Sequence, residues 1–274
     1  ANRWQVYIRY VPVKGKVLTS SFLRSKLIEG AKITQFDELP LSSQSKNTIK
    51  LIAIYGKLQI FVGYNLTTNK NSIMIESIQE LLQKEAQAVL NIPVTDAYER
   101  AVELIVEQIH RRKGKLVTSG MGKAGQIAMN IATTFCSTGI PSVFLHPSEA
   151  QHGDLGILQK NDLLLLISNS GKTREIVELT RLAHNLDPDL KFIVITGNPD
   201  SPLAKESDVC LSTGKPAEVC VLGMTPTTST TAMTVIGDIL VVQTMKETGF
   251  TIAEYSKRHH GGYLGEKSRS LCEK

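Results

Sequence analysis

The sequence contains few cysteines and no long hydrophobic run. Its four cysteines, Cys136, Cys210, Cys220 and Cys272, show no C-x-x-C spacing and are too few to form a disulfide framework for 274 residues. No segment reaches the roughly 18 apolar residues that a transmembrane helix requires, and the chain does not open with a basic segment followed by an apolar one. These absences predict a cytoplasmic protein with no membrane partner.

A strong excess of charge is also absent. The formal net charge is +5, and part of it lies in two short clusters, residues 110–113 and 257–260. A protein that binds nucleic acid usually gathers many more cations on one face, whereas a mildly basic chain suits an anionic metabolite. We therefore predict no nucleic-acid partner and interpret both clusters as solvated surface, with His259 as an exception considered below.

The first 73 residues differ in composition from the rest. Residues 4–11, 51–55 and 58–62 are rich in β-branched and aromatic residues, which predicts strands, and the polar stretch 41–48 predicts a loop. Because Met74 stands directly before a predicted helix and the chain begins without methionine, two interpretations stay open. Residues 1–73 are either a small β-rich domain or a non-native extension, and residues 74–274 form the main domain.

From residue 75 onward the sequence alternates between helical and strand patterns. Apolar spacing predicts helices over 75–90 and over 94–109, the second capped by Thr95 and Asp96. Strands follow at 116–118, 143–145, 163–167, 192–196 and 209–211, with helices ending near 135 and covering 173–186 and 228–246. This order predicts an α/β fold with a parallel sheet covered on both faces and a ligand at the carboxyl ends of the strands.

Hydroxyl and glycine residues follow the third of these strands. The segment Ser168-Asn169-Ser170-Gly171-Lys172-Thr173 opens a helix, where hydroxyls and free backbone N–H groups form an anion cradle. An ordinary helix cap would use the same residue types. Its position after a buried strand favours phosphate binding.

A glycine-rich turn follows the first strand. Residues 120–125, Gly-Met-Gly-Lys-Ala-Gly, match neither the dinucleotide-binding nor the P-loop spacing. A lone lysine is usually a surface charge, but Lys123 would enter the crevice at the strand ends, where it could stabilise an oxyanion.

Two histidines and two carboxylates lie within residues 146–154. His146 and His152 are six residues apart in a predicted loop, which argues against a catalytic metal and favours substrate contacts or an acid–base role. Taken singly, Glu175, Glu218 and His259 would be ordinary surface residues. The hydroxyl-rich stretch 226–231 is consistent with helix capping.

Taken together, these segments resemble the SIS (sugar isomerase) domain of arabinose 5-phosphate isomerases. The resemblance runs from about Ile75 almost to the C-terminus and rests on five segments in order: residues 120–123, 146–154, 168–171, 226–231 and 260–265. It implies a five-stranded parallel sheet in an α-β-α sandwich, assembled as a homotetramer with shared sites. It also implies interconversion of D-arabinose 5-phosphate and D-ribulose 5-phosphate, which supplies the eight-carbon acid sugar of lipopolysaccharide and some capsules.

The resemblance also assigns roles to individual residues. It implies that the catalytic residues are Lys123, Glu175, Glu218 and His259. It implies that the substrate-binding residues are Ser119, Gly139, Ile140, His146, His152, Ser168, Asn169, Ser170, Thr173, Thr228 and Ser229. No cofactor is required, and zinc at His146 would be inhibitory. Longer family members add CBS modules, which the resemblance does not extend to here.

Two departures and two alternatives stay open. His259-His260 stands where the family usually has His-Pro, and Lys172 stands where the phosphate loop often has Glu. Isomerisation through a cis-enediolate needs a carbon base, an oxygen proton route and a cation. Glu218 or Glu175 would be the base, His259 the proton carrier and Lys123 the cation. The alternatives are a sugar-phosphate-binding regulator and an isomerase for another sugar phosphate; the predicted strands in residues 1–73 argue against a regulator's helix-turn-helix module.

Overall fold

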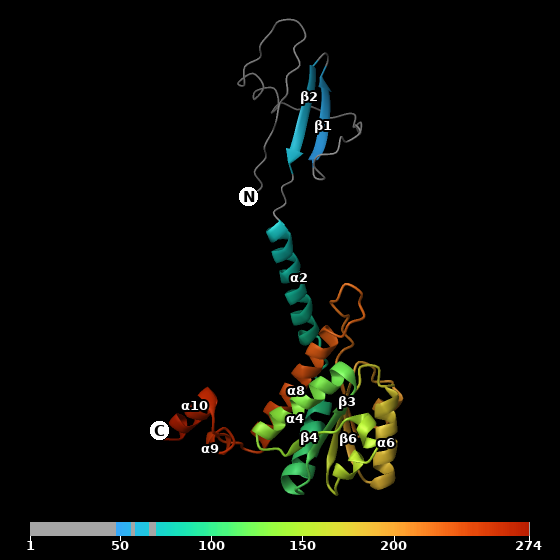
Figure 1. Ribbon diagram of the computed structural model, residues 1–274, viewed down its shortest axis with the longest axis vertical. Coiled ribbons are helices and arrows are strands. Elements are labelled where there is room, and N and C mark those ends of the chain that lie inside the picture. Colours follow the sequence, from blue (N-terminus) through green and yellow to red (C-terminus); the bar gives the residue numbers. More distant parts are fainter. Residues whose placement is uncertain (1–47, 56–57, 66–69, 274) are drawn as a thin grey trace. The chain divides into compact units, whose positions relative to one another are not determined.

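The computed structural model of the protein describes residues 48–55, 58–65 and 70–273 (Figure 1). The chain divides into two compact units, residues 1–77 and 78–274. Helix α2, Lys70–Leu90, begins in the first unit and ends in the second. Each unit is described by itself.

The first unit contains an antiparallel pair of strands. Strand β1, Thr48–Tyr55, pairs with β2, Leu58–Asn65, with Tyr55 opposite Leu58 next to the connection. This confirms the strands predicted at 51–55 and 58–62 and places residue 48, expected in the loop, in β1. The strand predicted at 4–11 and the loop predicted at 41–47 lie outside the described residues.

A five-stranded parallel sheet forms the centre of the second unit. Its order is β4, β3, β5, β6, β7, with bounds Ser142–Phe144, Leu116–Gly120, Leu163–Ile167, Lys191–Thr196 and Val209–Ser212. All neighbouring strands are parallel, which confirms the predicted fold class. Because Leu163 to Ile167 are buried on both faces, β5 can be almost entirely apolar.

Helices cover both faces of this sheet. The remaining helical elements are α3 Ala97–Ile105, the π-helix η1 Val106–Arg111, α4 Gly122–Ser137, α5 Pro147–Ala150, the 3-10 helix η2 Asp154–Ile157, α6 Arg174–Leu186, α7 Pro202–Glu206, α8 Thr228–Glu247, α9 Ile252–Ser256 and α10 Gly262–Cys272. Among these helices of the described chain, none is long and apolar enough to cross a membrane.

Alternate residues of β5 enter two separate cores. Leu163, Leu165 and Ile167 pack with α3, α4 and α8, while Leu164 and Leu166 pack with the opposite layer that contains α6. In Figure 1, α4 and α8 lie on one side of the sheet and α6 on the other. The three-layer arrangement follows from the strand period of two, which sends successive side chains to opposite faces.

Three local predictions differ from the structure. The helix expected from residue 75 begins at Lys70, as part of α2. The helix expected from Val94 begins at Ala97, because Asp96 is the N-cap residue and Val94 is 89% exposed, without a core to pack against. Thr95 accepts a hydrogen bond from the Ala97 N–H at 3.4 Å, whereas the Asp96 side chain makes no capping bond. The segment 146–154, expected as a loop, contains α5, whose first residue Pro147 suits a helix start.

The strand order reverses beside β3. The chain passes from β3 to β4 on one side and then to β5 on the other side of β3. The carboxyl ends of β3 and β5 therefore flank a topological switch point, where open α/β sheets bind their ligands.

Candidate functional site

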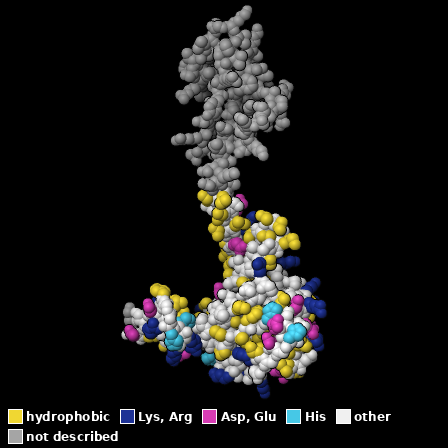
Figure 2. All heavy atoms as spheres, viewed as in Figure 1, with side chains coloured by type: hydrophobic (Ala, Val, Ile, Leu, Met, Phe, Trp, Pro, Cys, Tyr) yellow, Lys and Arg dark blue, Asp and Glu magenta, His cyan; other side chains and the backbone are white. Residues whose placement is uncertain are grey.

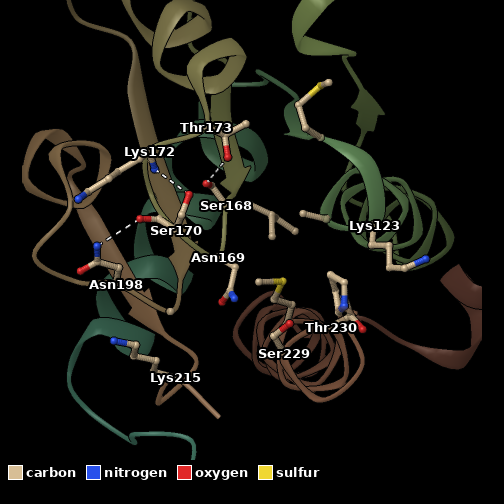
Figure 3. A pocket seen from close by; sticks show the side chains of 16 residues that line it. Lys123, Ser168, Asn169, Ser170, Lys172, Thr173, Asn198, Lys215, Ser229 and Thr230 are labelled. Atoms are coloured by element: carbon tan, nitrogen blue, oxygen red, sulfur yellow. Dashed lines mark hydrogen bonds between the residues drawn. The ribbon is translucent and has the colours of Figure 1, made fainter. Parts of the chain in front are cut away.

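A pocket of about 550 Å³ opens at this switch point (Figure 3). Its walls come from the turn after β3, the loop after β5, the ends of β6 and β7, and the first turns of α8. The lining residues are Met121, Lys123, Ala124, Ile167, Ser168, Asn169, Ser170, Lys172, Thr173, Gly197, Asn198, Lys215, Pro226, Ser229, Thr230 and Met233. The volume is within the range usual for small-molecule sites.

The loop after β5 is held in shape by its own hydroxyls. Ser168 Oγ lies 2.8 Å from Thr173 Oγ1 and accepts a hydrogen bond from the Gly171 N–H at 3.1 Å. The Lys172 N–H donates to Ser170 Oγ at 3.2 Å. Gly171 has φ of 61°, and a Cβ there would collide with the Ser201 side chain. The loop therefore requires glycine and presents a preformed polar surface before α6.

Glycine also lets α4 approach the end of β3 closely. A Cβ on Gly120 would lie 2.8 Å from the Ala124 backbone, and one on Gly125 would lie 2.6 Å from the Gly120 oxygen. Larger residues at these two positions would push α4 away. The close approach brings Lys123, in the first turn of α4, to the pocket.

The pocket is lined by three lysines, Lys123, Lys172 and Lys215, and, among the described residues, by no Asp or Glu. In Figure 3, Lys123 lies near Thr230 on one side, and Lys172, Asn198 and Lys215 lie on the other. Lysines without neighbouring carboxylates in a concave site attract anions. The arrangement can therefore bind a negatively charged small molecule.

Several lining residues were not predicted from the sequence. Asn198 Nδ2 donates to the Ser170 oxygen at 3.2 Å and so links the loop after β6 to the loop after β5. Lys215, with φ of 53°, follows β7, and Thr230 stands in the first turn of α8. No motif identifies Lys215 or Asn198. Their one sequence signal is that each follows a predicted strand. The carboxyl ends of parallel strands lie at the same side of a sheet, so residues that follow them lie close together.

Glu218 lies behind the pocket wall in a dense hydrogen-bond network. Its carboxylate accepts from the Thr227 N–H at 2.7 Å, from Thr227 Oγ1 at 3.0 Å, and from the Ser229 N–H at 3.3 Å and the Ser229 hydroxyl. Burial raises the pKa of Glu218, but these hydrogen bonds outweigh burial and leave the pKa below its usual value. Glu218 is thus ionised at neutral pH and contacts the pocket through Ser229.

Two predicted substrate-binding hydroxyls are already engaged inside the protein. Ser119 Oγ is buried and donates to the Leu145 oxygen at 2.7 Å. Thr228 Oγ1 is buried and bonds to Glu85 at 2.8 Å. Neither residue lines the pocket, whereas Ser168, Asn169, Ser170, Thr173 and Ser229 do.

The two predicted histidines of segment 146–154 lie outside the pocket lining. His146 is the N-cap residue of α5, packs edge-on against Phe144 and has a buried Nδ1 with no hydrogen-bond partner among the described residues. His152 is exposed in the turn after α5. In the described part of the chain, no three His, Cys, Asp or Glu side chains gather as metal ligands would. The roles predicted for these histidines stay predictions.

The remaining predicted residues also lie outside the lining. Glu175 is half-exposed in the first turn of α6. His259 stacks on Tyr255 with a centroid separation of 3.7 Å and bonds through Nδ1 to the Tyr255 oxygen at 3.0 Å. Gly139 lies against Phe250, and Ile140 is buried. The pocket of one chain therefore contains one of the four predicted catalytic residues, Lys123.

A second cavity, of about 840 Å³, lies at the amino ends of the strands. It is lined by Gln108, Arg112, Leu158, Gln159, Lys160, Asn161, Asp162, Ala183, Leu186, Asp187, Asp189, Leu190 and Lys191. Unlike the first pocket, it contains both acidic and basic residues. Several of these residues form hydrogen bonds with one another, such as Asn161 with the Arg112 oxygen and the Gln159 N–H with Asp162.

A five-stranded parallel sheet with a lysine-lined pocket at its switch point defines an α/β domain with a candidate site for an anionic small molecule. The SIS domain model matches residues 108–243. A candidate phosphosugar isomerase involved in capsule formation, from Bacteroides fragilis NCTC 9343, is 93% identical with a TM-score of 0.69, covering 69% of this chain and 99% of that one. The chain belongs to the SIS domain family.

Further relatives have a named activity or a bound ligand. The structure of an Escherichia coli CFT073 protein in complex with a sugar phosphate is 35% identical with a TM-score of 0.63, covering 69% of this chain and 98% of that one. The arabinose 5-phosphate isomerase KdsD of Pseudomonas aeruginosa is 41% identical over 204 residues, which are 74% of this chain and 61% of the relative. The arabinose 5-phosphate isomerase KdsD of Escherichia coli K12 is 46% identical over 164 residues, which are 60% of this chain and 49% of the relative. The chain thus spans about half to three fifths of these curated relatives.

Proposed function

We propose that this protein is an aldose–ketose isomerase that interconverts D-arabinose 5-phosphate and D-ribulose 5-phosphate. The observation that carries the proposal is the pocket at the ends of β3 and β5, with three lysines and a hydroxyl-rich loop. The similarity to curated arabinose 5-phosphate isomerases, at 41% identity or more over the matched segments quoted above, supports the choice of sugar.

The loop after β5 is the proposed phosphate site. A phosphate group carries two negative charges near neutral pH and accepts several hydrogen bonds, which matches the Ser170 hydroxyl, the Lys172 ammonium and the N-terminus of α6. Lys215, beside the same pocket, adds a second cation on this side. Phosphate binding here would direct the sugar toward α4 and α8.

Lys123 and Glu218 carry the chemistry in this proposal. Isomerisation moves a proton between C1 and C2 and develops negative charge on oxygen, which a lysine ammonium stabilises. Glu218 bonds to the Ser229 hydroxyl, which lines the pocket, whereas Glu175 lies outside the lining, and this favours Glu218 as the group that takes the carbon proton. It stands behind Ser229, so rotation of the Ser229 side chain would expose it to substrate.

The proposal includes a homotetramer with sites shared between copies. Hydrophobic side chains are exposed on α2, at Ile78, Leu81 and Leu82. They are also exposed in the connection between β7 and α8, at Val221 and Leu222 (Figure 2). Contiguous apolar surface of this kind marks protein interfaces. In the tetramer, His259 would reach the pocket of another copy, which accounts for its absence from the pocket of its own chain.

The remaining parts of the proposal concern metal, pathway and compartment. An enediolate mechanism needs no metal, so we propose that no cofactor is required and that zinc, if bound at His146, inhibits. The D-arabinose 5-phosphate formed in the cytoplasm would supply the biosynthesis of 3-deoxy-D-manno-octulosonate for lipopolysaccharide or capsule. The capsule role named for the Bacteroides fragilis relative supports this destination.

The direct test is turnover by the EDTA-treated protein. We expect D-arabinose 5-phosphate to be converted to D-ribulose 5-phosphate, with solvent deuterium entering at C1 of the ribulose 5-phosphate. Conversion that requires added zinc would contradict the metal-free mechanism. Tight binding of pentose phosphates without conversion would point instead to a sugar-phosphate-binding regulator, and conversion of another sugar phosphate alone would overturn the substrate.

Shared sites can be tested by mixing variants. Lys123→Ala and His259→Ala each remove a group from a different part of the proposed site. If the two groups meet across an interface, co-expressed chains will form some sites with both intact, and activity will return to about a quarter of the wild-type value by random assembly. No recovery, with mixed oligomers demonstrated, would place His259 in the site of its own chain or outside it.

A further inference from the structure

A hydrogen-bond chain connects α2 to the first turn of α8, outside the pocket. Thr228 Oγ1 donates to Glu85 Oε1 at 2.8 Å and accepts from the Val219 N–H at 3.2 Å. Glu85 and Thr228 are 143 residues apart in the sequence. Because Val219 directly follows Glu218, this chain of bonds fixes the backbone beside the proposed base.

The Thr228 hydroxyl is well suited to transmit this constraint. A hydroxyl has one donor, and here that donor is directed to Glu85 Oε1. Fixing the donor direction also fixes the lone pairs that accept from Val219, and the two bonds polarise one another. Thr228 is 1% exposed, so water does not compete for these bonds. Glu85 therefore orients Thr228, and Thr228 holds Val219.

Glu218 is consequently anchored in two ways. Its side chain accepts hydrogen bonds from Thr227 and Ser229, and its neighbouring backbone is held by Thr228. The first anchor lies within the β7–α8 segment and α8 and would move together with them. The second leads to α2, a separate helix, and so sets where Glu218 stands relative to the rest of the unit.

We propose that Glu85 is a positioning residue for Glu218, acting through Thr228 and Val219. This inference rests on the proposed isomerase function. The matched SIS segment begins at residue 108, so the tether comes from a helix outside that segment. A base displaced by about 1 Å can cost about a hundredfold in rate, so the tether has a measurable consequence.

The partly buried carboxyl group decides which substitution tests this proposal. Glu85 Oε2 is buried and has no hydrogen-bond partner among the described residues. Thr228→Val would therefore leave a partly buried carboxyl group with neither oxygen bonded, which destabilises the protein for a different reason. Glu85→Leu removes the charge and the acceptor together. Glu85→Gln retains an acceptor oxygen of the same reach and is the conservative rescue.

The first measurement separates kcat from KM. In Glu85→Leu we expect kcat to fall about 10- to 100-fold with KM changed less than about threefold, because the base is displaced while the phosphate site is intact. Glu85→Gln should keep most of the wild-type kcat. Glu80→Leu, an exposed glutamate on the same helix, is the matched control. Wild-type kcat in Glu85→Leu would overturn the proposal. Glu85→Ala is measured alongside in case the leucine variant fails to fold.

The second measurement does not depend on turnover. Amide hydrogen exchange at Val219 should become about tenfold faster in Glu85→Leu, because its acceptor is no longer oriented, and should stay near the wild-type rate in Glu85→Gln and Glu80→Leu. Unchanged exchange at Val219 would refute the tether. If the wild-type protein converts no pentose phosphate, the proposed function fails, while this exchange result still decides whether Glu85 holds the backbone next to Glu218.

Discussion

Charged residues line a cavity at each end of the strands of the central sheet, at the amino edge and at the carboxyl edge. The two cavities differ in how these charges are combined. At the amino edge, basic and acidic residues stand together: Lys115 lies 2.5 Å from Asp162, Lys191 lies 3.0 Å from Asp208, and Asp187 and Asp189 also line the cavity. At the carboxyl edge, Lys123, Lys172 and Lys215 make no ion pair within the described residues. The smaller cavity, about 550 Å³ against about 840 Å³, is thus the better candidate for binding an anion. The absence of Asp and Glu from its described lining, more than its volume, distinguishes this cavity from the one at the amino edge.

The largest expected difference between the edges is in catalysis. Lys123→Ala should lower kcat about 10²- to 10³-fold, since it removes the cation proposed to stabilise the developing oxyanion. Lys160→Ala, at the amino-edge cavity, is the matched control and should leave kcat and KM near wild type. Steady-state kinetics on both variants decides the matter. Equal losses in the two would abolish the distinction drawn between the edges.

The next difference is in substrate affinity. Ser170→Ala removes a hydroxyl from the proposed phosphate loop, and a hydrogen bond to a charged group is worth about 1.5–3 kcal/mol, so KM should rise about 10- to 100-fold. Binding of inorganic phosphate should weaken by a similar factor. A KM that rises while phosphate affinity stays constant would move the phosphate away from this loop.

At the amino edge the expected effect is on stability. Asp162 is 2% exposed and accepts from the Lys115 N–H at 2.9 Å, the Gln159 N–H at 2.7 Å and the Lys115 ammonium at 2.5 Å. Asp162→Asn weakens all three interactions and should lower the free energy of unfolding by about 3 kcal/mol. Chemical denaturation measures this change. The activity per folded molecule should stay unchanged, and a loss of kcat without loss of stability would give the amino edge a functional role.

Much of the fold could be predicted from the sequence because its signals are local. The five strands of the sheet are apolar runs bounded by turns, and β5 at Leu163–Ile167 matched its predicted bounds. Short elements such as α9 at Ile252–Ser256 have too few residues to show a helical period. The π-helix η1 at Val106–Arg111 continues the apolar spacing of α3, so the sequence does not distinguish it from an α-helix.

The site was predictable only in part, for a different reason. Ser168, Ser170 and Lys123 lie in motifs that follow buried strands, and the rule for parallel sheets places them together. Lys215 and Asn198 have no motif, and they reach the pocket only because β6 and β7 end beside it. The bond between Glu85 and Thr228 depends on how α2 meets α8, which no local pattern encodes.

The smallest effect concerns thiol reactivity at the carboxyl edge. Burial raises the pKa of Cys220, but hydrogen bonds from Thr225 and from the Met224 and Leu222 N–H groups outweigh it and lower the pKa to about 7. Cys210, inside β7, has a pKa raised by burial. Because the thiolate is the nucleophile, alkylation of Cys220 by iodoacetamide should rise with pH and reach half its maximal rate near pH 7, while Cys210 stays slow throughout.

Mass spectrometry of each cysteine after timed labelling measures both rates. If Cys220 reached half its maximal rate only well above about pH 8, the ordinary range for a free thiol, its sulfur would not be held by these N–H groups.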